Sequence, residues 1–111
     1  MANRADEIVK IAYKALDDKK AEDIKIIDIG DISVIADYFV IADGTNSSQV
    51  EAMVDQVTDE LAKQGIHPAR VEGIRSSGWI LMDFNDVVIH IFSKDLERIW
   101  RDGKVVEPES L

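Results

Sequence analysis

The chain has 111 residues, a net charge of −9, no cysteine and 46% hydrophobic residues. This length predicts a single domain over residues 1–111, and the lack of cysteine excludes disulfides, thiolate nucleophiles and cysteine metal ligands. Neither a signal-peptide core nor an apolar run of about 18 residues is found, so we expect a cytoplasmic protein without membrane association. The acidic balance disfavours binding to free nucleic acid and suits a basic partner.

An amphipathic helix and two strands are the first elements expected. The helix is indicated by apolar residues at helical spacing, namely Ile8, Ile11, Ala12, Ala15 and Leu16. A strand ending near Gly30 is indicated by Ile24, Ile26, Ile27 and Ile29. The almost continuous apolar run from Tyr38 to Ala42, bounded by Gly44, is typical of a strand that is buried on both faces.

A second helix is indicated by the apolar stripe of Val50, Met53, Val54, Val57 and Leu61. Its first residue is left open because Thr45, Asn46, Ser47 and Ser48 all suit an N-cap, and Ser48 with Glu51 has the spacing of a capping box. Gly65 and Pro68 mark its end.

The last third of the chain predicts a short edge strand over 69–73, a turn over 76–78, a hairpin, a short helix over 96–100 and a loose tail over about 102–111. Strands and helices mixed in this order predict an α/β (α+β) fold in which a mixed β-sheet is flanked by helices.

The hairpin lies in "GWILMDFNDVVIHIF", from Gly78 to Phe92. Asn85-Asp86 tolerates the positive φ angles of a two-residue turn, which would pair Asp83 with Val88 and Leu81 with His90. Because side chains alternate along a strand, one face would then hold only apolar residues and form the core: Ile80, Met82, Phe84, Val87, Ile89 and Ile91. The opposite face would hold Trp79, Leu81, Asp83, Val88, His90 and Phe92.

Large apolar groups beside one acid and one imidazole are typical of a partner-binding surface. Two alternatives stay open. A Trp in a strand often belongs to the core, and a face of this kind can pack on itself in a homodimer. The interface hypothesis predicts that Trp79 and Phe92 are partly exposed in the isolated chain, whereas a helix covering both would exclude it.

Residues 43–48, "DGTNSS", could hold an anion, because they place hydroxyl groups at the start of a helix after a strand. Nucleotidyl-transfer folds add an Asp-x-Asp pair on the next strand for two metal ions, but the corresponding segment here offers only Glu72. Asp28 and Asp31 have a spacing that suits turns, and neither His67 nor His90 has a suggestive serine or second metal ligand. We therefore expect no catalytic residue, metal or cofactor. A nucleotide-binding or nucleotidyl-transfer enzyme using the 43–48 loop remains the alternative.

Several of these segments together resemble the ribosomal silencing factor family, also called the Iojap family. The resemblance runs from about Ala5 to Trp100. It rests on Asp37–Ile41, the turn at Gly44, Glu72-Gly73, Trp79 with Asp83, the strand containing His90, and Leu96–Trp100. In one respect the chain departs from the family pattern. The segment between Phe92 and Leu96 is several residues shorter than usual, either through a deletion or because a stretch is omitted from the sequence.

The resemblance implies a nucleotidyltransferase-like fold without catalytic carboxylates, and a repressor of translation that is not an enzyme. Such a protein binds the large ribosomal subunit through ribosomal protein number fourteen, a basic protein, and blocks joining of the small subunit. Trp79, Asp83 and His90 match the family's motif positions, whereas Leu81 and Phe92 join the expected partner-binding residues through strand alternation alone. The motif at Asp37 and Tyr38 is structural or supports the interface.

Overall fold

The computed structural model describes residues 4–31, 34, 36–74 and 78–93. These residues form α1 (Arg4–Asp18), β1 (Glu22–Asp28), β2 (Tyr38–Gly44), α2 (Ser47–Ala62), β3 (Arg70–Ile74), β4 (Trp79–Asp83) and β5 (Val87–Ser93). The strands make one five-stranded sheet in the order β1-β2-β5-β4-β3. Only β2 and β5 run parallel, and the other neighbours are antiparallel. The predicted mixed sheet flanked by helices is confirmed. The helix expected over 96–100, the tail, the short segment before Leu96 and most of the 76–78 turn lie outside the described residues.

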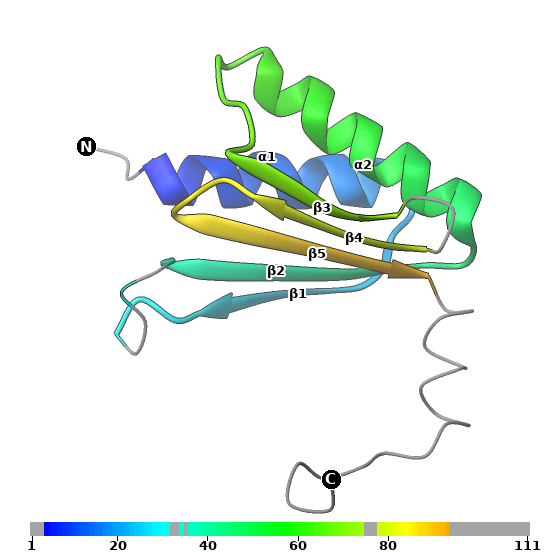
Figure 1. Ribbon diagram of the computed structural model, residues 1–111, viewed down its shortest axis with the longest axis horizontal. Coiled ribbons are helices and arrows are strands. Elements are labelled where there is room, and N and C mark those ends of the chain that lie inside the picture. Colours follow the sequence, from blue (N-terminus) through cyan, green and yellow to red (C-terminus); the bar gives the residue numbers. More distant parts are fainter. Residues whose placement is uncertain (1–3, 32–33, 35, 75–77, 94–111) are drawn as a thin grey trace, which may run out of the picture.

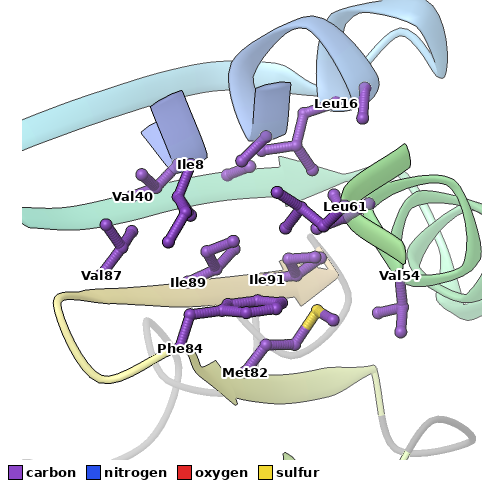
Figure 2. Packing of buried hydrophobic residues seen from close by; sticks show 14 of the residues in the cluster. Ile8, Leu16, Val40, Val54, Leu61, Met82, Phe84, Val87, Ile89 and Ile91 are labelled. Carbon is purple, nitrogen blue, oxygen red and sulfur yellow. The ribbon is translucent and has the colours of Figure 1, made fainter. Parts of the chain in front are cut away.

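The hydrophobic core lies between the helices and one face of the sheet. Figure 1 shows α1 and α2 side by side over that face. Figure 2 shows apolar side chains of the helices and of the sheet pointing toward one another. They include Ile8, Leu16, Val40, Val54, Leu61, Met82, Phe84, Val87, Ile89 and Ile91. All six hairpin residues predicted to face the core are buried. No described helix is long and apolar enough to span a membrane.

The hairpin has the predicted two-residue turn. Asp83 pairs with Val88 and Leu81 pairs with His90, as expected. The Phe84 amide donates a hydrogen bond to the Val87 carbonyl at 2.9 Å, which closes the loop. Asn85 has a φ of +70°, a conformation that asparagine adopts more readily than most residues. The register therefore follows from local turn chemistry.

The expectation that β2 is buried on both faces is wrong. Val40 and Ala42 are fully buried beneath the helices, but Phe39 and Ile41 point to the other side of the sheet and are only half-buried. Both described helices pack on the same face, so the opposite face of β2 has no helix from the described part of the chain. A continuous apolar run does not distinguish these two situations, because both faces of the strand carry apolar side chains.

The N-terminus of α2 is capped by Asn46, not through a capping box at Ser48 and Glu51. The Asn46 side-chain oxygen accepts a hydrogen bond from the Gln49 amide at 2.9 Å, and Asn46 has the extended backbone of an N-cap residue. Ser48 is already inside the helix, which begins at Ser47. The sequence alone did not identify the cap, because residues 45–48 all have side chains that can cap a helix.

Replacing Asn46 with alanine is expected to lower the free energy of unfolding by about 1 kcal/mol, because the Gln49 amide loses its acceptor. Ser48→Ala is the matched control and should change stability by less than about 0.5 kcal/mol. Urea unfolding followed by circular dichroism measures both. Equal losses for the two variants would contradict the assignment of the cap.

Candidate partner-binding face

The face of the sheet opposite the helices carries a continuous group of half-buried side chains. We call it the open face and define it by Ile41, Trp79, Leu81, Asp83, His90 and Phe92. Strand pairing sets Trp79 beside Phe92, and His90 between Leu81 and Ile41. Trp79 and Phe92 are both partly exposed, as the sequence predicted, and the five expected partner-binding residues lie on one surface. Their partner-binding role remains a prediction.

Near the hairpin turn, the same side of the sheet is covered by the chain between β1 and β2. Ile29 and Ala36 pack there with Val88, and Phe39 and Leu81 border them. Val88 is therefore buried, with 9% of its surface exposed, although alternation places it with the open-face residues. The accessible part of this side is shifted toward Trp79 and Phe92.

Phe39 and Ile41 extend this side beyond the hairpin, and the sequence reasoning did not place them there. They join it because β2 pairs in parallel with β5, which sets Phe39 beside Val88 and Ile41 beside His90. Strand alternation alone places Phe39 and Ile41 on the face opposite the buried Val40 and Ala42. The sequence did not show that β5 is the neighbour of β2, so it did not place these two residues beside the hairpin.

His90 lies at the centre of the open face among aromatic rings. Its ring meets Phe39 edge-on with centroids 5.5 Å apart, and it stacks on Phe92 with centroids 6.2 Å apart and an angle of 11°. Burial in these surroundings lowers the pKa of His90 below its usual value, because desolvation penalises the charged imidazolium. The imidazole is therefore neutral at pH 7, with one donor and one acceptor nitrogen.

Folding stability should rise with pH just below the ordinary histidine pKa of 6.5. The lowered pKa of folded His90 means that the unfolded chain binds more protons in this interval, so acidification favours unfolding. This contribution is complete above pH 6.5 and is lost as the pH falls toward the folded pKa. Urea unfolding between about pH 5 and 7.5 should show a steeper pH dependence for wild type than for His90→Gln. Identical slopes in this range would contradict the expected pKa shift.

Asp83 lies at the rim of the open face and already has two partners. One carboxylate oxygen accepts a hydrogen bond from the Asn85 amide at 2.8 Å, and the other lies 3.5 Å from the Arg70 guanidinium. About a fifth of the side chain, 21%, remains exposed. Asp83 therefore stabilises the hairpin turn and also presents negative charge at the edge of an apolar surface.

The two roles of Asp83 can be separated by substitution. Asp83→Ala should lower the free energy of unfolding by about 1 kcal/mol, because the Asn85 amide loses its acceptor. Asp83→Asn keeps an acceptor oxygen and loses only the charge. Because an exposed ion pair contributes little, it should cost less than about 0.5 kcal/mol. Thermal unfolding compares them, and an equal loss for both variants would show that the charge, not the turn, dominates.

Asp37 and Tyr38 both make contacts that support the fold. The Tyr38 hydroxyl donates to the Asp6 carboxylate at 3.0 Å and so joins β2 to α1. This hydrogen bond, together with nearby negative charge, raises the pKa of Tyr38. The backbone of Asp37 donates to the Asp86 carbonyl at 2.7 Å and accepts from the Ile29 amide at 2.9 Å. Of the two roles left open for this motif, these contacts favour the structural one.

In the 43–48 loop, both hydrogen-bond donors of Thr45 have partners within the chain. The Gln49 side-chain oxygen accepts from both the amide and the hydroxyl of Thr45, at 2.5 and 2.7 Å. The Gln49 amide group donates in turn to the carbonyls of Lys19 and Lys20. An anion bound by the Thr45 amide and hydroxyl would therefore have to displace Gln49. Within the described residues, no group of three or more histidines and carboxylates is placed to hold a metal ion.

Comparison with known proteins identifies the family. The family model for "ribosomal silencing factor during starvation" matches residues 2–111. The chain belongs to the ribosomal silencing factor family. A relative from Bacillus subtilis (strain 168), named ribosomal silencing factor RsfS, is 41% identical over 106 residues, which cover 90% of each protein.

The chain is also similar to a more distant protein and to a solved structure. A mouse (Mus musculus) protein named "Mitochondrial assembly of ribosomal large subunit protein 1" is 29% identical over 101 residues, covering 83% of this chain and 44% of that protein. A crystal structure from Chromobacterium violaceum aligns with a TM-score of 0.77 and 29% identity over 96% of this chain and 93% of its own.

Proposed function

We propose that this protein represses translation by binding the large ribosomal subunit through its open face, which sterically prevents the small subunit from joining. The main support for this proposal is the half-buried cluster of Trp79, Leu81, His90 and Phe92 on the face opposite the helices. Membership in a family named for ribosomal silencing supports the function, and the name of the mouse relative supports the large subunit as the target.

The chemistry of the open face suits a basic protein partner. Trp79 and Phe92 supply apolar area that binding would bury, and aromatic side chains of this kind contribute most at protein interfaces. The Asp83 carboxylate and the net charge of −9 would attract a positively charged surface. We propose ribosomal protein number fourteen as that partner, because it is basic and this chain is acidic.

Occlusion of the small subunit needs no chemical reaction. The family is named for a regulatory factor, and the described residues that reach the open face include no serine or second histidine beside His90. Binding alone would repress translation, in the cytoplasm, for as long as the protein occupies the intersubunit surface.

The test is co-sedimentation of the purified protein with separated ribosomal subunits, followed by light scattering of subunit joining. We expect the protein to sediment with the large subunit alone, to reduce joining, and to bind more weakly as salt is raised. Binding to the small subunit, or to neither, would refute the proposal. Light scattering of the protein by itself shows whether a homodimer occupies the same face. In that case occupancy of the large subunit should rise less than proportionally with protein concentration, because only the dissociated monomer exposes the face.

A further inference from the structure

We propose that Gly73 is a positioning residue for Trp79: the missing side chain at Gly73 leaves the space in which the indole lies, and so fixes the largest aromatic group of the open face. The contact between Gly73 and the Trp79 indole is observed in the structure. Its consequence for ribosome binding rests on the proposed function.

Gly73 lies on β3, the edge strand, where it pairs with Ile80 next to Trp79. Its φ is +100°, a backbone conformation that L-residues rarely adopt. A Cβ atom built at Gly73 would overlap the Trp79 carbonyl oxygen, and would lie 2.6 Å from Cε3 and 3.0 Å from Cζ3 of the indole. The six-membered half of the indole therefore lies directly against the Gly73 backbone.

Gly65 shows that this contact is separate from the need for a positive φ. Gly65 follows α2 with a φ of +72°, and a Cβ built there meets nothing within 4 Å. A substitution at Gly65 strains the backbone but displaces no neighbour. At Gly73 the same substitution would also displace the Trp79 carbonyl and the indole, because neither the backbone nor a rigid ring can yield as a flexible chain end would.

An aromatic ring packed on a glycine of an edge strand shields backbone that would otherwise be exposed. In return, the backbone limits the orientations of the ring. A side chain that is already held in one position loses little conformational freedom when a partner binds, so the contact raises affinity by preorganisation. We infer that Gly73 acts on binding through Trp79, without a contact of its own to the partner.

The ring contact can be tested without disturbing the fold. The ring current of an indole displaces the NMR resonances of protons packed against it, upfield over the ring face and downfield at the ring edge. We therefore expect the Gly73 α-proton resonances of the wild type to lie outside the usual glycine range. In Trp79→Ala these resonances should return to the usual glycine range, while those of Gly65 stay unchanged. Ordinary Gly73 shifts in the wild type would overturn the proposal, whether or not the protein binds ribosomes.

The consequence for binding is tested by Gly73→Ala beside Gly65→Ala, each measured by co-sedimentation with the large subunit. Gly73→Ala should weaken binding at least about tenfold, a large part of the loss expected for Trp79→Ala, whereas Gly65→Ala should stay within about twofold of wild type. In a Trp100→Phe background, Gly73→Ala should also shift the emission and increase the acrylamide quenching of Trp79. Gly65→Ala should do neither.

The outcomes separate this inference from the proposed function. If Trp79→Ala weakens binding but a folded Gly73→Ala does not, the positioning role is refuted and the open face stands. If Trp79→Ala leaves binding unchanged, the open face is refuted, and the NMR shifts still decide whether Gly73 holds the indole. Should Gly73→Ala fail to unfold cooperatively, the wild-type NMR comparison alone decides.

Discussion

Replacing Trp79 with alanine is expected to weaken binding to the large ribosomal subunit by at least about 2 kcal/mol, or roughly thirtyfold. Trp79 is the largest side chain on the open face, and it is half-buried between Phe92 and the Gly73 backbone. A partner would bury the rest of the indole, and truncation removes that area. Co-sedimentation over a range of protein concentrations measures the loss.

Tyr13→Ala is the matched control for this experiment. Tyr13 is an aromatic residue on α1, 44% exposed, and α1 covers the other face of the sheet. Its truncation should leave binding within about 0.5 kcal/mol of wild type. If the two variants lose affinity equally, the partner does not distinguish the two sides of the protein. A loss below about 0.5 kcal/mol for folded Trp79→Ala would remove Trp79 from the interface.

The largest effect on stability is expected for Ile89→Ala, which should lower the free energy of unfolding by about 2–5 kcal/mol. Ile89 is fully buried in the middle of β5, beneath both helices, so truncation leaves a cavity in the core. Urea unfolding measures the loss. Binding to the large subunit should be unaffected under conditions in which the variant remains folded.

Ile41→Ala removes the same atoms from the opposite face and serves as the control. Ile41 is half-buried beside His90, so solvent can fill the space and the loss should be about 1 kcal/mol. Binding should weaken instead. A loss of stability as large as that of Ile89→Ala would show that something covers the open face in the free protein, and a homodimer would be the first explanation to test.

The β4–β5 hairpin was predictable because its determinants are local. The turn at Asn85 fixes the register, and alternation then assigns each side chain to a face, so the burial of Ile80 and Ile91 and the partial exposure of Trp79 follow. The helical stripes around Leu16 and Leu61 were predictable for the same reason, since the periodicity of a sequence reports which side of an element is buried.

Features that depend on contacts between distant segments were not predictable. Parallel pairing of β2 with β5 brings Ile41 beside His90, and no short pattern specifies that partner. The burial of Val88 depends on Ile29 and Ala36, which come from a loop far away in sequence. The cap at Asn46 is seen only in the folded structure. There the Asn46 side chain accepts from the Gln49 backbone amide, while the Gln49 side chain donates to a carbonyl just after α1.

The position of β5 in the sheet affects when the open face can form during synthesis. β5 is the last described strand of the chain, yet it lies between β2 and β4. Until it is made, β1–β2 and β3–β4 have no described strand to join them, and Trp79 and Ile41 have no common surface. A nascent chain that does not yet contain β5 therefore cannot present the open face. A chain that ends before β5 would leave two strand edges unpaired, which exposes it to aggregation and degradation.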